Sequence, residues 1–158
     1  MSGPRAVRAW RAVTALGSRP VAYTVVAGRC LLAPPGRGAG ARLAPPAVLA
    51  VADAVRELTC RAVDRPRPPG AGRRTAVHGA SFPSRHTMTA LIAWDLASGS
   101  RPAAVAVTAA VGASRLALGA HWPTDVLGGW LFGAVGLALA DLCGGHRRLR
   151  TRDSEANR

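Results

Sequence analysis

The stretch SRLALGAHWPTD, residues 114–125, places an arginine, a histidine and an aspartate close together in an otherwise apolar part of the chain. His121 stands four residues before Asp125, and Pro123 is a favourable first residue of a helix. We therefore expect Asp125 in the first turn of that helix, pointing back toward His121, where a carboxylate fixes the tautomer of an imidazole. Arg115 precedes the pair and can bind phosphate oxygens through two parallel hydrogen bonds. The stretch predicts a phosphate clamp, a nucleophilic histidine and its orienting carboxylate.

A second set of polar residues lies upstream, in DRPRPPGAGRRTAVHGASFPS, residues 64–84. This segment is too rich in proline and glycine to be helical throughout. Arg67 adds a cation, and Ser84 with the backbone N–H groups that open the next helix adds hydrogen-bond donors for an anion. His86 begins that helix, so two histidines can divide a phosphoryl transfer: one attacks phosphorus, and the other protonates the leaving alkoxide and then activates water. His78, in contrast, is expected to be a loop residue without a role.

Most of the remaining chain is predicted to be helical. The expected helical segments are residues 9–33 (broken near 17–20), 46–63, 86–98, 102–118 and 123–143. The fold class is therefore expected to be all-α: an integral membrane bundle of four to five helices with the active site at one membrane face. Asp53, Arg56 and Glu57 stand at helical spacing in the second segment and can pair with one another.

Two of these segments approach the length of about 20 apolar residues that a membrane-spanning helix needs. They are PAAVAVTAAVGASRLALGA, residues 102–120, and DVLGGWLFGAVGLALADLC, residues 125–143, and both are apolar on all sides rather than amphipathic. Gly129 and Gly133 have the spacing that lets helices approach closely in lipid. Mean hydropathy is only +0.14, because alanine and glycine are weakly hydrophobic, so a soluble helical bundle remains the alternative.

The charge of the chain indicates anionic partners. Its 21 basic residues are all arginine and outnumber 8 acidic residues, for a formal net charge of +13. A nucleic-acid partner is disfavoured, because the arginines are scattered between apolar stretches, no nucleic-acid-binding motif accompanies them and only 4% of the residues are aromatic. The three cysteines form no CxxC pair, which argues against a disulfide framework and a zinc site. A membrane lipid that carries phosphate, within a lipid bilayer, is the expected partner.

The basic residues also suggest how the chain crosses the membrane. The arginines of a polar basic tail, residues 147–158, are expected in the cytoplasm. The loops at 61–85 and 119–124 then meet on the outer face, where the excess of arginine in the first loop is explained by phosphate binding. We expect a single membrane phosphatase domain over residues 1–146, with its core at 43–143. The chain is expected to cross the membrane several times with the active site facing outward, and the family resemblance described next implies the inner membrane of a bacterium.

The segments DRPRP, SFPSRHT and SRLALGAHWPTD resemble, in order and spacing, the three-part signature of the type-2 phosphatidic acid phosphatase and vanadium haloperoxidase superfamily. The third segment matches fully, as S-R-x-x-x-x-x-H-x-x-x-D. The resemblance implies that His121 is the nucleophile, that Asp125 orients it and that His86 is the general acid. It also implies that phosphate is held by Arg67, Ser84 and Arg115. No metal and no other cofactor is expected for phosphatase activity in this family.

Two positions depart from the signature. Arg85 stands where the family usually has glycine, so it either adds a phosphate contact or projects into solvent while its backbone N–H serves. The lysine that the family carries seven residues before Arg67 falls on Cys60 here. Its neighbour Arg61 is the expected replacement for that lysine as a phosphate-binding cation.

The sequence therefore predicts a membrane-bound lipid phosphate phosphatase that works through a phosphohistidine intermediate and without a metal. The expected substrate is a polyprenyl phosphate or diphosphate, a prenyl-linked phosphosugar or phosphatidate. One alternative is a non-catalytic membrane protein that binds anionic lipid with a relic site. The other is a vanadate-dependent haloperoxidase, although such enzymes are large and soluble. The sequence does not predict an oligomeric state.

Overall fold

The computed structural model describes residues 3–34 and 38–142, and within them the chain forms six α-helices, one short 3₁₀-helix and no strand. The helices are α1 (Pro4–Ala15), α2 (Arg19–Leu31), α3 (Ala39–Val63), η1 (Gly70–Gly72), α4 (Arg85–Ser98), α5 (Arg101–Ala117) and α6 (Pro123–Leu142). The expected all-α class is confirmed. The tail expected at residues 147–158 lies outside the described residues.

The expected count of four to five helices is wrong, because the first expected segment forms two separate helices. The chain turns at Leu16–Ser18, and Pro20 occupies the first turn of α2, where its missing N–H is not needed. Helix α3 begins at Ala39, well before the expected start at Pro46. Pro45 and Pro46 lie inside it, since the φ angle of proline suits a helix even though two backbone hydrogen bonds are lost.

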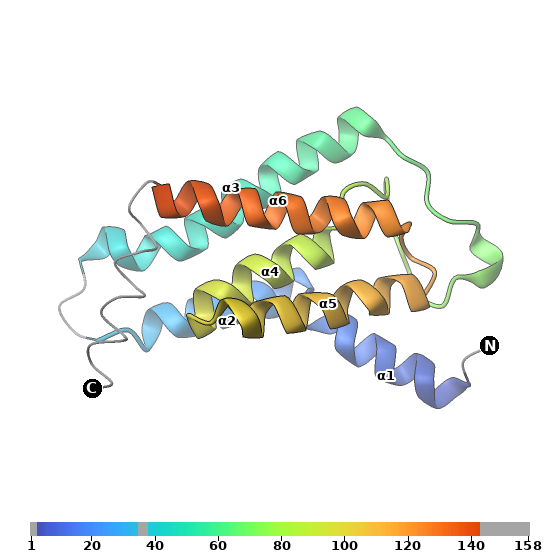
Figure 1. Ribbon diagram of the computed structural model, residues 1–158, viewed down its shortest axis with the longest axis horizontal. Helices are drawn as coiled ribbons and strands as arrows, with labels where there is room; N and C mark the ends of the chain where they lie inside the picture. The colour runs from blue at the N-terminus through green and yellow to red at the C-terminus, as the bar shows by residue number, and fades with distance from the viewer. Residues whose placement is uncertain (1–2, 35–37, 143–158) are drawn as a thin grey trace.

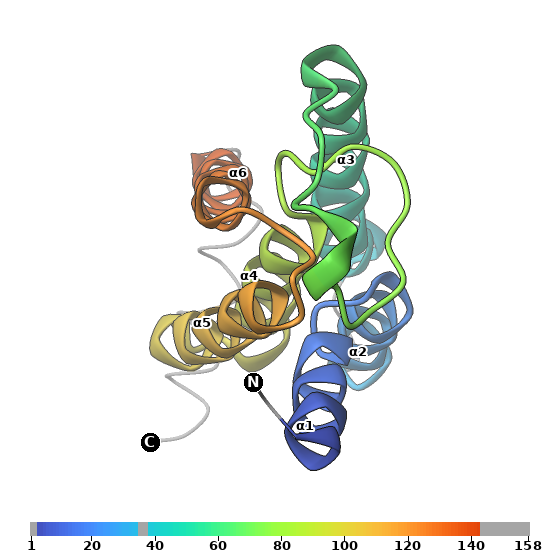
Figure 2. The same ribbon diagram turned by 90° about the vertical axis from the view of Figure 1, so that its right-hand side faces the viewer.

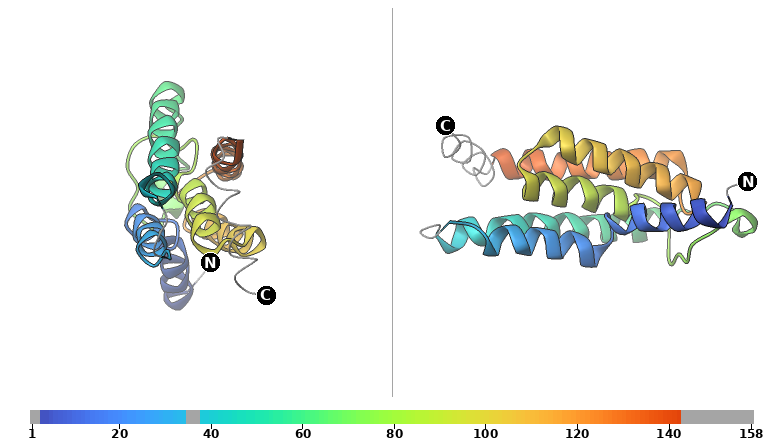
Figure 3. Two further views of the ribbon diagram at one scale, coloured as in Figure 1. Left: turned by 90° about the vertical axis from the view of Figure 1, so that its left-hand side faces the viewer. Right: turned by 90° about the horizontal axis from the view of Figure 1, so that it is seen from below.

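Helix α4 is the centre of the bundle. It contacts α2, α3, α5 and α6, and Figures 1 and 3 show the other helices arranged around it. Most of its side chains from Thr87 to Leu96 are buried, including Met88 and Ile92, which are fully enclosed. Its sequence lacks a polar face for this reason, and its position makes it the scaffold for the residues at its N-terminal end.

Helix α6 is, among the described residues, the one helix both long and apolar enough to cross a membrane. Large apolar side chains recur along its exposed side, among them Leu127, Leu131 and Leu139, each more than half exposed. Helix α3 presents a similar exposed row that includes Val51 and Leu58. Such surfaces are unfavourable in water over a large area and are typical of helices that face lipid.

Two glycines let α6 approach α4 closely. A Cβ atom at Gly129 would lie 2.5 Å from the carbonyl oxygen of Ser84, and one at Gly133 would lie 3.0 Å from Cδ2 of Leu91. The close approach that their spacing allows is therefore observed, although the spacing by itself did not distinguish it from a general richness in glycine. It also fixes the start of α4 against the first turns of α6.

The loop of residues 64–84 and the turn of residues 118–122 lie at the same end of the bundle, as Figure 2 shows. The backbone N–H of Arg74 donates to the carbonyl of Leu118 at 3.0 Å, and that of Ser84 donates to the carbonyl of Asp125 at 2.9 Å. The expectation that the two loops meet at one end is thus confirmed, and their junction forms the wall of a cavity.

Candidate active site

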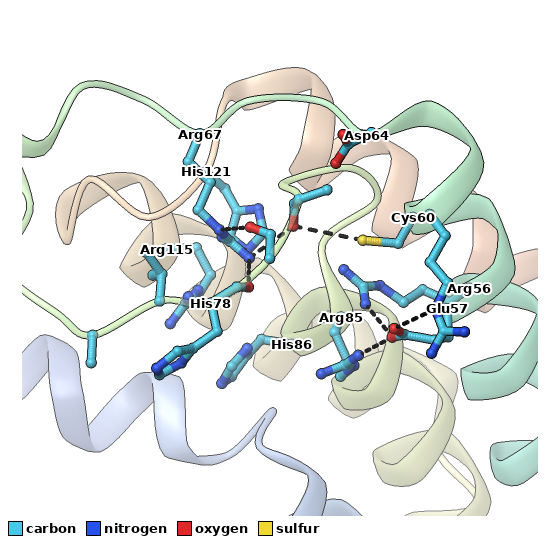
Figure 4. Close-up of a pocket in the computed structure, with 15 residues that line it drawn as sticks. Arg56, Glu57, Cys60, Asp64, Arg67, His78, Arg85, His86, Arg115 and His121 are labelled. Atoms are coloured by element: carbon cyan, nitrogen blue, oxygen red, sulfur yellow. Dashed lines mark hydrogen bonds and ion pairs between the residues drawn. The ribbon is translucent and has the colours of Figure 1, made fainter.

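The cavity at this end of the bundle has a volume of about 520 Å³ and is strongly basic. Figure 4 shows charged side chains converging on it from α3, from the loop of residues 64–84, and from α4, α5 and the α5–α6 turn. Six of the eight residues expected at the site line it: Arg61, Arg67, Arg85, His86, Arg115 and His121. The other two, Ser84 and Asp125, are fully buried behind its wall.

His121 and Asp125 form the pair that their spacing predicts. Nδ1 of His121 lies 3.4 Å from Oδ2 of Asp125, and the carboxylate also accepts the backbone N–H of Trp122 at 2.8 Å. Its other oxygen, Oδ1, accepts from Nη1 of Arg65 at 3.0 Å. The carboxylate is thus held from three sides. With the proton of His121 on Nδ1, the lone pair of Nε2 is left for the cavity.

The side chain of Arg67 holds the loop of residues 64–84 through hydrogen bonds to its backbone carbonyls. Its Nε donates to the carbonyl of Gly79 at 2.9 Å, and Nη2 donates to the carbonyls of His78 and Ala80 at 3.0 and 2.9 Å. Its Nη1 donates to the carbonyl of Ala120 at 2.9 Å and lies 3.3 Å from Nε2 of His121. Four of the five N–H groups of this guanidinium donate to backbone carbonyls, and the fifth faces Nε2 of His121. The same cation fixes the backbone of both loops and touches the ring nitrogen that faces the cavity.

Burial and positive charge both act on the imidazole of His121. Burial lowers its pKa below the ordinary value, the hydrogen bond to Asp125 opposes this, and the charges of Arg115 and Arg67 lower the pKa further. The net direction is downward, so the imidazole is neutral at neutral pH. A neutral imidazole with its proton held on Nδ1 is the form that can attack an electrophile.

Arg115 enters the cavity from the last turn of α5. Its side chain is almost completely buried, and Nη1 donates to Oγ1 of Thr14 on α1 at 3.1 Å. Its Nε is buried without a partner among the described residues. A buried cation with an unused donor is costly unless an anion binds it. This side chain is therefore suited to bind an anionic ligand.

His86 and Ser84 lie at the start of α4. His86 is the second residue of the helix, is half-buried and faces the cavity across from His121 (Figure 4). Ser84 is the residue that precedes the helix, and its Oγ accepts from Oγ1 of Thr87 at 3.0 Å. The side chain of Ser84 is thus turned toward Thr87 and away from the cavity, whereas the imidazole of His86 reaches the cavity itself.

Arg85 takes part in an ion-pair network rather than projecting into solvent. Its Nη2 bonds to Oε2 of Glu57, and its Nε lies 3.2 Å from Oδ1 of Asp53. Asp53 also accepts from Nε of Arg19 on α2 at 2.6 Å. The expectation that Asp53 pairs with Arg56 and Glu57 on its own helix is wrong for Asp53, because this carboxylate is buried toward α2 and α4 and finds its partners there.

Four residues shape the site through contacts or positions that the sequence did not predict. Arg56 and Glu57 line the cavity, Arg65 holds Asp125, and Thr14 holds Arg115. The sequence contains a signal for Arg56 and Glu57, because two adjacent charged residues in an otherwise apolar helix indicate a structural or functional role. The roles of Arg65 and Thr14 depend on contacts between distant parts of the chain. No group of three or more His, Cys, Asp or Glu side chains within residues 3–34 and 38–142 is arranged to hold a metal ion.

The cavity of this helical bundle joins two histidines, one of them paired with a buried aspartate, and several arginines, and these are groups that phosphoryl transfer can use. The comparisons with known proteins agree, because the family model of the PAP2 superfamily matches residues 43–148. The chain belongs to the PAP2 superfamily, as its three-part signature predicts, and is a phosphatase that acts on lipid phosphates.

One solved structure is similar over nearly the whole chain. It is a transmembrane PAP2 type phosphatidylglycerolphosphate phosphatase from Bacillus subtilis, with a TM-score of 0.71 and 25% sequence identity, covering 94% of this chain and 79% of that chain. The comparison with curated proteins gives no significant match. The similarity of a transmembrane enzyme supports the assignment of this chain as an integral membrane helical bundle.

Proposed function

We propose that this phosphatase hydrolyses its lipid substrate through a phosphohistidine, with His121 as nucleophile and His86 as general acid. Nε2 of His121 forms a bond to phosphorus while the bond from phosphorus to the leaving oxygen breaks. His86, which takes up a proton when the anionic phosphate enters the cavity, gives that proton to the oxygen. In the second step His86 accepts a proton from water, whose oxygen attacks phosphorus and breaks the P–N bond. Phosphate leaves, and the lone pair returns to Nε2.

The arginines supply the charge that this reaction requires. Arg115 offers its unpartnered Nε to a phosphate oxygen, and Arg67 already stands at the attacking nitrogen. The transition state places negative charge on the non-bridging oxygens, and fixed donors stabilise that charge without reorganisation. In this proposal Asp125 keeps the proton of His121 on Nδ1 and stabilises the imidazolium-like ring that forms as Nε2 attacks.

The substrate is proposed to carry phosphate at the headgroup level and an acyl or prenyl tail in the bilayer. An apolar groove of about 540 Å³ between α3 and α6 supports this, because α3 also lines the basic cavity. Candidate substrates are a polyprenyl phosphate or diphosphate, a prenyl-linked phosphosugar and phosphatidate, together with phosphatidylglycerolphosphate from the similar structure. The proposed location is a bacterial inner membrane with the cavity facing outward.

The observation that carries the proposal is the pairing of His121 with Asp125 directly across a basic cavity from His86. The test is phosphate release by detergent-purified protein from each candidate lipid, with EDTA present. The wild type is expected to release phosphate and His121→Ala to release none. His78→Ala serves as the matched control, because it removes an exposed imidazole from the rim of the same cavity. Equal release by wild type and His121→Ala would overturn the mechanism.

A further inference from the structure

The positive charges around the cavity are not equally available to a ligand. The guanidinium of Arg67 uses four of its five donors on backbone carbonyls, and Arg85 is bound by two carboxylates. Arg56 differs from both. Its Nε donates to the carbonyl of Pro83 at 3.0 Å and its Nη1 donates to Oε2 of Glu57 at 3.1 Å, while the structure shows no acceptor for Nη2 among the described residues.

Arg56 lies close to the position at which the family signature has a lysine and this chain does not. It lies one helical turn before Cys60 on α3, so the two residues share a face of the helix, and both line the cavity. Position 60 is the one at which the signature carries lysine. The thiol of Cys60 has its Sγ 3.7 Å from the carbonyl of Ala80 and brings no positive charge. The side chains of Cys60 and Arg56 approach the same cavity from successive turns of α3 (Figure 4).

Arg61, the expected replacement, is less well placed. Its side chain is 74% exposed, with Nε 3.4 Å from Oε1 of Glu57, whereas the side chain of Arg56 is 4% exposed. The charge of Arg56 is also felt at the opposite wall of the cavity. The pKa of Arg67 is lowered first by burial and next by the positive charge of Arg56. A phosphate bound between them would be stabilised by both cations.

We propose that Arg56 is a phosphate-binding residue of this enzyme, taking the place on α3 of the signature lysine that is Cys60 in this chain, and that Glu57 is the counter-ion of Arg56. This inference rests on the proposed function. Glu57 accepts from Arg56, Arg61 and Arg85. When a phosphate dianion enters, Nη2 and one N–H of Nη1 of Arg56 turn to its oxygens, and Glu57 keeps its other two partners.

The test removes the positive charge at position 56 of α3 and then restores a positive charge at position 60. Arg56→Gln is expected to raise KM and the inhibition constant of orthovanadate, a phosphate analogue, by tenfold or more, with a smaller change in kcat. Adding Cys60→Lys to Arg56→Gln returns the cation to the same face one turn later and is expected to recover most of the lost affinity. Arg5→Gln removes an exposed arginine from α1 and serves as the matched charge control.

Three outcomes would overturn the proposal. The first is vanadate inhibition of Arg56→Gln within twofold of the wild type. The second is a loss in Arg56→Gln that comes with a lower melting temperature and no recovery by Cys60→Lys, which would make the contact with Pro83 the whole role of Arg56. The third is a larger loss of affinity in Arg61→Gln than in Arg56→Gln.

Failure of the proposed function would be distinguishable. Even if the wild type released no phosphate from any lipid, the affinity for inorganic phosphate could be measured by calorimetry. Comparison of the wild type, Arg56→Gln and the double variant would then give the contribution of this cation to phosphate binding. Tenfold weaker binding by Arg56→Gln with recovery in the double variant would support the inference, and equal binding by all three would overturn it.

Discussion

Nη1 of Arg67 lies 3.3 Å from Nε2 of His121, while the remaining N–H groups of Arg67 are bound to backbone carbonyls of two loops. One guanidinium therefore sets the shape of the cavity wall and the surroundings of the proposed nucleophile. A planar group with five donors can do this, and an ammonium cannot, because it has three donors in a different geometry.

We expect Arg67→Lys to lower kcat/KM by about 100-fold even though the charge is kept, because a misplacement of the nucleophile by about 1 Å costs this much. The loop of residues 64–84 should also become more sensitive to protease. Arg65→Lys is the matched control, since Arg65 uses only Nη1 in its contacts with Thr124 and Asp125 and a lysine can replace it. Similar kinetics for wild type and Arg67→Lys would contradict the assigned role.

The pH dependence of the reaction should report the lowered pKa of His121. Protonation of Nε2 removes the lone pair, so activity falls as the pH drops through the pKa of this imidazole. Because burial and two arginines lower that pKa, the acid limb of kcat/KM is expected to have its midpoint below about 6.5, the ordinary value. Asp125→Asn removes the contact that raises the pKa, so the residual activity of this variant should have its midpoint lower still. A wild-type midpoint above 6.5 would contradict this prediction.

The close approach of α6 to α4 predicts a stability effect at Gly129. In Gly129→Ala the new methyl group would lie 2.5 Å from the backbone oxygen of Ser84 and 2.9 Å from Cβ of Thr87, so α6 must shift. We expect a loss of about 1–3 kcal/mol in the free energy of unfolding, seen as a lower melting temperature in detergent. Gly136→Ala is the control, because its methyl group would lie 3.5 Å from Cδ1 of Ile92, an ordinary contact. Equal melting temperatures for the two variants would contradict the packing argument.

The end of the bundle away from the cavity should affect stability without affecting catalysis. Asp95 is 1% exposed, and its Oδ1 lies 3.0 Å from Nε of Arg101. Arg101→Gln is expected to cost about 1–3 kcal/mol, less than for a fully buried pair because Arg101 is one-third exposed. The folded variant should keep the wild-type kcat. Adding Asp95→Asn should recover part of the stability, and a failure to recover any would mean that this ion pair is not the cause.

The residues that the sequence predicts most clearly are those whose relation is local. His121 and Asp125 stand one helical turn apart, so their contact follows from Pro123 opening a helix. The two loops were expected at the same end of the bundle because two helices separate them. That number is correct even though the total number of helices was not. The all-α class followed from long apolar segments without a strand pattern.

Contacts between distant segments could not be predicted in the same way. Asp53 pairs with Arg19 and Arg85, and the sequence offered it two nearer partners on its own helix. The choice depends on which face of α3 is buried, and that is decided by packing against α2 and α4. The hold of Arg67 on backbone carbonyls likewise depends on the path of an irregular loop, which leaves no periodic pattern in the sequence.

The turn between α1 and α2 has a consequence for the boundaries of the working enzyme. Thr14 holds Arg115, Oγ1 of Thr89 donates to the carbonyl of Gly17 at 2.6 Å, and a Cβ at Gly17 would lie 2.3 Å from the carbonyl oxygen of His86. The region that matches the family begins only at residue 43. A chimera that grafts this region onto a foreign N-terminal anchor would keep every signature residue and yet lack the α1–α2 turn against which helix α4 rests. A transplant of the activity therefore requires the α1–α2 turn together with the region that matches the family.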